Sequence, residues 1–336
     1  MALLQVPHKY SKFGFAMQTA QGTAATTPTV VIPVKETSGI TEKIERDFFQ
    51  YADGVLGGPT HYFTKSQGLE GEIAMPLIPG MLVGSGGYGG FQVDKSTPTD
   101  TIADIGAWLF ARETKDETDV GQGFYATLFV DRGHNALAYP DVKCVSGNMS
   151  LVPEELIMMN LTLRGIGIPT AWTPGETVGT LDWATTTAVT VAPYVFNHAA
   201  ISLWAAADTH LKSLTLNWDN MVQSLSDAMT LGYKTRPQYL PNTELAQWTG
   251  EFDREFAGTT VYTPWANGTP GAVVIQIGNT VGTAQIWFPR CVYSDWDVKI
   301  PTEGILMEDG ISFQALGPAI GGTTQAFIVS EAVTPV

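Results

Sequence analysis

Basic side chains are scarce in this sequence of 336 residues, which has 18 Lys and Arg against 33 Asp and Glu. The formal net charge of −15 disfavours ordinary binding to duplex DNA, because such binding depends on Lys and Arg displacing counterions from phosphates. Charged residues make up only 15%, compared with roughly 25% in an average soluble domain. The acidic excess either keeps the protein soluble or supplies a negative potential that the protein uses.

Cysteines and long apolar runs are also scarce. Cys144 and Cys291 cannot by themselves form a disulfide framework or a four-ligand zinc site, and we expect both to be buried thiols. No apolar stretch approaches the length of about 18 residues that a membrane helix needs. The N-terminus also lacks a basic segment ahead of an apolar run. We therefore expect neither a membrane span nor secretion.

Motifs for catalysis, metal binding and cofactor binding are missing as well. The five histidines show no H-x-x-x-H or H-x-x-E spacing, and neither a nucleophile elbow nor a phosphate-binding P-loop is present. Asp295 and Asp297 form a D-x-D, which we interpret as part of a strand and not as a metal site. The sequence therefore predicts no enzyme, no cofactor and no bound metal.

One glycine-rich stretch, LVGSGGYGGFQV, matches G-x-G-x-x-G at Gly84, Gly86 and Gly89. A dinucleotide fingerprint needs a strand before these glycines and a helix directly after them, inside a βαβ unit. Here an extended segment that ends in proline follows instead. We predict a long loop of the kind that is often functional or ordered by a partner.

Two blocks of the sequence resemble each other. Residues 144–167 and 291–317 both open with Cys-Val, continue through an apolar-Pro pair and an acidic turn, and end in an alternating strand, LTLRGIG or ISFQALG. Upstream, Gly71-Glu72-Ile73 has a counterpart in Gly250-Glu251-Phe252. An internal duplication is the simplest account. It would place each cysteine at the same position of its own copy and leave a disulfide between them improbable.

Short alternating runs dominate both copies and are typical of half-buried β-strands. The clearest helix follows the glycine-rich loop, where Ile102, Ile105 and Leu109 share one face. We predict a mainly β protein with two similar domains, each with about one helix. The expected divisions are an N-terminal arm at 1–34, domains at 35–168 and 205–318, a connector at 169–204 and a C-terminal arm at 319–336.

Acidic residues alternate along the strand TGEFDREF, with Phe252, Arg254 and Phe256 on its opposite face. A solvated sheet face would account for this pattern. The alternative is that the face repeats around a ring and lines a wall of negative potential, since like charges along one strand otherwise destabilise it. The candidates for such a wall are Glu70, Glu72, Glu251, Asp253 and Glu255.

The N-terminal block contains a Gly-x-Ala-x-Gln entry, the Gln-Gly-Thr-Ala-Ala segment, a proline-bounded strand, and then Ser-Gly-Ile with a charged stretch that ends in Asp-Gly. In these features it resembles the tail tube (major tail) proteins of long-tailed bacteriophages. The closing alternating strands are also similar to the end of a tail-tube domain. The resemblance implies a structural protein of a siphophage virion that forms stacked rings, through which DNA leaves the capsid without sequence-specific contacts.

The resemblance also implies that each of the two domains is a β-sandwich or barrel with about one flanking helix, and that three copies of such a chain make a pseudo-hexameric ring with an acidic lumen. Implied partners are further copies of the chain, the tape measure, the tail terminator and the distal tail protein, with assembly in the host cytoplasm. The loop with Gly84, Gly86, Gly87, Tyr88 and Gly89, together with both arms, would contact a neighbouring subunit or ring.

Three alternatives remain open at this point. Nine tryptophans and eleven tyrosines could stack on sugars in a carbohydrate-binding or adhesin-like β-sandwich protein. Paired carboxylates could serve a glycosidase. Another virion protein, such as a sheath, capsid or tail-terminator protein, would share many of the same features.

Overall fold

The structure is a computed structural model that describes residues 12–18, 21–35, 38–49, 61–79, 108–109, 125–132, 136–171, 193–204, 206–229, 235–241, 243, 247–256, 258, 260–278, 282–299, 306–316 and 328–333. Antiparallel strands make up most of this part of the chain, which confirms the mainly β prediction. The described helices are short: a 3-10 helix η2 (Phe196–His198) and α2 (Tyr262–Asn267). Trp108 and Leu109 are helical and belong to the helix predicted after the glycine-rich loop, whose Ile102 and Ile105 lie outside the described residues.

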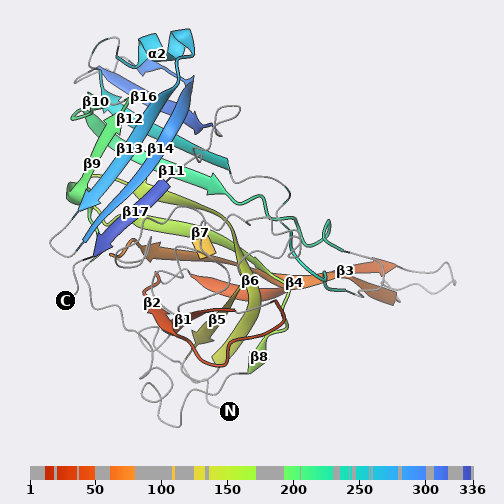
Figure 1. Ribbon diagram of the computed structural model, residues 1–336. Helices are drawn as coiled ribbons and strands as arrows, with labels where there is room; N and C mark the ends of the chain where they lie inside the picture. The colour runs from red at the N-terminus through yellow and green to blue at the C-terminus, as the bar shows by residue number, and fades with distance from the viewer. Residues whose placement is uncertain are drawn as a thin grey trace.

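The described part of the first half of the chain contains eight strands, shown in red to green in Figure 1. Their neighbours follow the order β3–β4–β7–β6–β5–β1–β2, with β8 also paired to β6. The bounds are β1 (Lys12–Met17), β2 (Val30–Ile32), β3 (Gly39–Phe49), β4 (His61–Pro76), β5 (Ala126–Asp131), β6 (Ala136–Leu151), β7 (Met158–Gly165) and β8 (Thr170–Ala171).

Nine strands, shown in green to blue, lie in the residues that the structure describes in the second half. Their neighbours follow the order β11–β12–β16–β14–β13–β9–β10, while β15 pairs with β16 and β17 with β14. The bounds are β9 (Ala199–Leu203), β10 (Ala206–Ala207), β11 (Leu211–Asp219), β12 (Gln247–Glu255), β13 (Gly271–Gly278), β14 (Gly282–Asp295), β15 (Val298–Lys299), β16 (Met307–Ala315) and β17 (Ile328–Val333).

The two halves thus repeat one pairing order, in which β3, β4, β7 and β6 correspond to β11, β12, β16 and β14. The register repeats as well: Gly71 lies opposite Leu163 and Glu72 opposite Thr162, as Gly250 lies opposite Phe313 and Glu251 opposite Ser312. Helical residues lie between β4 and β5, at Trp108 and Leu109, and again between β12 and β13, in α2. The blocks that look alike in sequence therefore occupy matching places in the sheet.

The cysteines, however, do not occupy matching places, and the expected alignment of the two Cys-Val pairs is wrong by two residues. Cys144 lies opposite Leu163, and Leu163 corresponds to Phe313 in the second half. The residue opposite Phe313 is Tyr293, so Tyr293 corresponds to Cys144. Cys291 lies two residues earlier, opposite Ala315. A bulge that follows Cys144 in β6 and Tyr293 in β14 fixes this register. Both cysteines are buried and free, as expected.

The long strands β6 and β14 each belong to two parts of the sheet. The first part of β6, up to Val142, pairs with β5, and the part from Val142 to Ser150 pairs with β7. A strand shared in this way lets a sheet fold over and bury its apolar face between two layers. One cluster of buried side chains joins both layers and both halves, and it includes Phe15, Trp108 and Phe313.

Segments that were expected to be arms or connectors are partly built into the sheet. Residues 12–17 form β1 because alternating Phe13, Phe15 and Met17 are apolar enough to enter the core, where each is at most 5% exposed. Residues 199–203 form β9, and residues 328–333 pair with β14 of the same chain. The glycine-rich loop lies outside the described residues.

The halves are joined by a direct pairing of β6 with β11, from Leu151 opposite Leu214 to Ser146 opposite Asp219. Gly147 is required at this joint, because a Cβ atom there would lie 2.3 Å from the ring of Trp218. Trp218 in turn stacks on Trp248, with ring centroids 5.3 Å apart. We call this β6–β11 pairing the internal joint.

Candidate functional site

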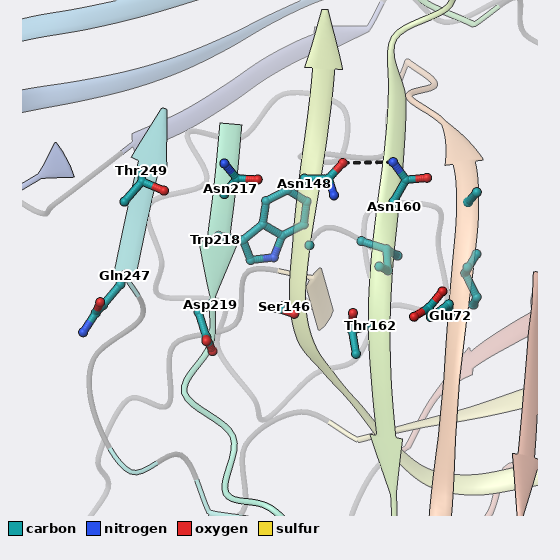
Figure 2. A pocket seen from close by; sticks show the side chains of 14 residues that line it. Glu72, Ser146, Asn148, Asn160, Thr162, Asn217, Trp218, Asp219, Gln247 and Thr249 are labelled. Atoms are coloured by element: carbon teal, nitrogen blue, oxygen red, sulfur yellow. Dashed lines mark hydrogen bonds between the residues drawn. The ribbon is translucent and has the colours of Figure 1, made fainter. Parts of the chain in front are cut away.

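A polar surface runs across five neighbouring strands, β4, β7, β6, β11 and β12, and therefore crosses the internal joint (Figure 2). Strand alternation creates it, because every second residue of these strands points away from the core. In β12 the burial pattern alternates strictly between exposed and buried from Gln247 to Phe252. We call this surface the polar sheet face.

The side chains of the polar sheet face lie in rows across the strands. Its central row consists of amides and a hydroxyl, and Asn160 donates a hydrogen bond of 2.9 Å from Nδ2 to Oδ1 of Asn148. The register gives this row as Asn160, Asn148, Asn217 and Thr249. The next row is Glu72, Thr162, Ser146, Asp219 and Gln247.

These rows line a hollow with a volume of about 500 Å³. Glu72 and Asp219 are the charged side chains among the residues that line it, so its charge is entirely negative. Asp219 also accepts a hydrogen bond of 2.7 Å from the backbone N–H of Met221. The lining is made of amides, hydroxyls and carboxylates, so the hollow offers hydrogen bonds and negative potential.

The five acidic residues singled out in the sequence fall into different environments. Glu72 and Glu251 are exposed, and neither has an ion-pair partner in the part of the chain that the structure describes. Glu251 lies opposite Ser312 on β16, just as Glu72 lies opposite Thr162 on β7. Within the described residues, these two matching positions keep a charge that no ion pair compensates.

The other three acidic residues have partners. Glu70 accepts a hydrogen bond of 2.8 Å from Lys43, and this contact raises the pKa of Lys43. Glu255 lies 2.5 Å from Lys212, and hydrogen bonding to this lysine lowers the pKa of Glu255. Asp253 accepts hydrogen bonds from the hydroxyl of Ser213 and the backbone N–H of Gly310. The negative potential on β4 and β12 is therefore weaker than the sequence indicates.

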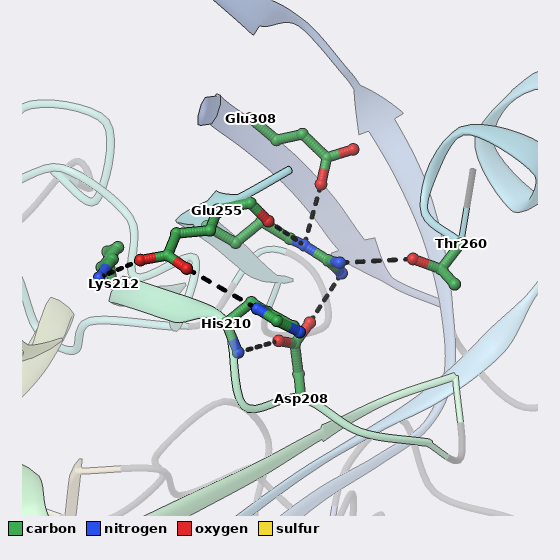
Figure 3. A network of polar contacts seen from close by, with 7 residues as sticks. Asp208, His210, Lys212, Glu255, Thr260 and Glu308 are labelled. Carbon is green, nitrogen blue, oxygen red and sulfur yellow. Dashed lines mark hydrogen bonds and ion pairs between the residues drawn. The ribbon is translucent and has the colours of Figure 1, made fainter. Parts of the chain in front are cut away.

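Arg254 lies on the opposite face of β12, as predicted, and it is 4% exposed. Its guanidinium contacts Asp208 at 2.7 Å, Glu308 at 2.9 Å and the hydroxyl of Thr260 at 3.3 Å (Figure 3). Glu308 also accepts a hydrogen bond of 2.8 Å from the indole of Trp296. This buried network ties β12, β16 and the segment before α2 together, and its place inside the fold indicates a structural role.

Sequence reasoning missed Asp208 and Glu308 as partners of this arginine. The usable signal was Arg254 itself, since a cation at a buried strand position requires carboxylate partners from elsewhere in the chain. Sequence reasoning also missed the three asparagines of the central row, because they come from three strands, β7, β6 and β11, that are separated in sequence.

Clusters of metal ligands and reactive thiols are both absent from the described residues. Within this part of the chain, no group of three or more His, Cys, Asp or Glu could hold a metal ion. Burial raises the pKa of both Cys144 and Cys291 to about 12, so neither is a ready nucleophile. No helix in the described ranges has the length and apolar character needed to cross a membrane.

The comparisons with known proteins agree with the sequence resemblance. The family described as phage tail tube protein matches residues 11–326, which takes in both halves of the sheet and the internal joint. A comparison with curated proteins found no similar sequence. The match spans nearly the whole chain, and we conclude that this protein belongs to the phage tail tube protein family.

Proposed function

We propose that three copies of this chain close into a ring of a siphophage tail tube, that rings stack, and that the polar sheet face lines the lumen through which DNA is ejected. The observation that carries the proposal is the continuity of the polar sheet face across both halves, within a chain of the tail tube family. Each half is a tail-tube-like domain on this proposal, so three chains supply six domains to a ring.

The chemistry of the face suits a passage for DNA. A wall with lysine or arginine would hold DNA by releasing counterions from its phosphates. The hollow instead has amides, hydroxyls and the carboxylates of Glu72 and Asp219. Such a wall remains hydrated and repels phosphates, so DNA can slide along it without being retained.

The number of strands is also sufficient for a wide channel. Each half contributes four strands to the layer that bears the polar sheet face: β3, β4, β7 and β6 in the first, and β11, β12, β16 and the end of β14 with β15 in the second. Barrel diameter grows with strand number, and barrels of about 16 to 18 strands already leave an aqueous channel. Three chains would exceed that number.

Contacts between rings can be assigned to the β3–β4 hairpin, which projects beyond the rest of the sheet (Figure 1). Its outer part exposes Phe48, Tyr62 and Phe63, which are 59%, 65% and 50% accessible. Exposed aromatic clusters of this kind mark interaction sites. The glycine-rich loop and the chain ends are further candidates. The tape measure, tail terminator and distal tail protein would be the other partners in the virion, after assembly in the host cytoplasm.

Electron microscopy of the purified chain in negative stain, after concentration and mild heating, tests this proposal. Stacked rings with a central channel are expected, and averaging should give three-fold symmetry. Isolated particles of about 36 kDa that never assemble would contradict it and would favour the carbohydrate-binding or adhesin-like alternative. A glycan-binding assay on those particles would then be the next step.

A further inference from the structure

Among the described residues, two strand edges remain open in the layer that carries the polar sheet face. Among the described strands, β3 pairs only with β4, and β15 pairs only with β16. The last residues of β14, from Val292 to Asp295, likewise pair only with β16. One open edge therefore lies in the first half of the chain and the other in the second half.

Each open edge corresponds to a strand that is paired at the internal joint. The register of the repeat matches β3 with β11, so that Gly39 corresponds to Thr215 and Lys43 to Asp219. It also matches the end of β14 and β15 with the second part of β6, so that Asp295 corresponds to Ser146. The internal joint pairs β11 with β6. In the described part of one chain, the equivalents of these two strands, β3 and the end of β14 with β15, both lack that partner.

We propose that β3 of one copy pairs antiparallel with the end of β14 and β15 of a second copy, and that this contact repeats the internal joint between chains. The inference rests on the proposed function, because it describes how neighbouring chains of the ring meet. It specifies a register that ring formation alone does not require. Asp219 lies opposite Ser146 at the internal joint, so Lys43 lies opposite Asp295 of the second copy.

The charges at this register are complementary. The side chain of Lys43 is 47% exposed, and its ammonium group, which contacts Glu70 at 2.8 Å and Glu45 at 4.0 Å, has three donors, so one is left for a further partner. Asp295 is exposed at the end of β14, where one carboxylate oxygen accepts a hydrogen bond from the backbone N–H of Trp296. Opposite charges on directly facing residues stabilise a strand pair, and like charges destabilise it.

The register also predicts one irregularity. Glu308 and Met158 occupy matching positions of the repeat. Val298 lies opposite Glu308 and Ser150 lies opposite Met158, so Val298 corresponds to Ser150. The stretch from Asp295 to Val298 is thus one residue shorter than the stretch from Ser146 to Ser150. Gly39 then lies opposite Val298, and β3 must accommodate its extra residue as a bulge between Gly39 and Lys43.

The alternative is that both strand edges stay exposed to water and pair with no other chain. Charged side chains on an edge strand can serve to prevent pairing with other chains. That alternative predicts no defined partner for Lys43. The proposed pairing predicts Asp295 of another copy, so cysteine cross-linking separates the two.

The test is a full-length chain with both Lys43→Cys and Asp295→Cys, oxidised in assembled tubes. The two native cysteines are buried, so they give little background. We expect covalent species up to a closed trimer on non-reducing gels, and only monomers from either single variant. The register control is Glu45→Cys with Asp295→Cys, because a shift of two residues moves the Cα atoms about 7 Å apart, beyond disulfide reach.

Tubes whose Lys43→Cys and Asp295→Cys sites do not cross-link would overturn this pairing and leave the proposed function standing. Preferential cross-linking of the register control would overturn the register. A wild-type chain that forms no rings would overturn both the proposed function and the pairing. If the cysteine variant fails to fold, exchanging the two charges is a second test. Lys43→Asp should reduce ring formation at least tenfold, and adding Asp295→Lys should restore it. Unimpaired assembly of Lys43→Asp would contradict the ion pair.

Discussion

Replacing Arg254 with methionine should destabilise the second half of the chain strongly. The substitution keeps most of the side-chain volume but leaves two carboxylates without their cation. The side chains of Asp208 and Glu308 are only 6% and 0% exposed, so water cannot replace the guanidinium. Removing one partner of a buried ion pair typically costs about 3–5 kcal/mol of unfolding free energy. We expect a loss in this range.

Urea unfolding followed by tryptophan fluorescence measures this loss, because Trp296 is hydrogen-bonded to Glu308. With a slope near 3 kcal/mol/M, the midpoint should fall by about 1 M or more. Neutralising the carboxylates in the same variant, by Asp208→Asn and Glu308→Gln, should recover at least half of the loss.

Lys65 provides the matched control, since its ion pair with Asp47 is exposed and Lys65→Met should leave the urea midpoint unchanged. A loss below about 1 kcal/mol for Arg254→Met would refute the reasoning. So would a loss that the two neutralising substitutions do not reduce, because the arginine would then act through packing alone.

Three further predictions concern the internal joint, the thiols and the polar sheet face. Gly147→Ala should cost about 1–3 kcal/mol in urea unfolding, because its Cβ would lie 2.3 Å from the Trp218 ring, and an unchanged midpoint would contradict this packing. Cys144 and Cys291 should not react with a thiol reagent at pH 8 until urea unfolds the chain, because burial raises the pKa of each to about 12. Rapid labelling of the folded protein would disprove this. Glu72→Lys should still assemble, but its tubes should retain DNA at low salt and release it at high salt, whereas equal DNA retention by wild-type and variant tubes would show that this position is not luminal.

The class of fold and the repeat were accessible from sequence because both depend on local patterns. Alternation along LTLRGIG and ISFQALG predicts strands, and these become β7 and β16, which occupy matching positions. The similar Gly-Glu pairs at residues 71–72 and 250–251 even fall in the same register. Local similarity failed for the cysteines, because bulges, and not the Cys-Val pairs, set the register of β6 and β14.

The candidate site was only partly accessible, because it depends on which strands become neighbours. The alternation of TGEFDREF singled out Glu251, and the repeat singled out Glu72 as its counterpart; both remain uncompensated among the described residues. Sequence reasoning did not foresee that Lys43 and Lys212 offset the charges of Glu70 and Glu255, since each pair joins different strands. Pairings between distant segments follow from the whole sheet and cannot be deduced from one strand at a time.

The most direct test of the central claim is a cryo-electron microscopy reconstruction of assembled tubes at a resolution that separates strands. The account predicts three chains per ring, with Asn148, Asn160 and Asn217 facing the channel and a continuous sheet around it. A reconstruction in which this face packs against another protein surface, or points to the outside of the tube, would contradict the account.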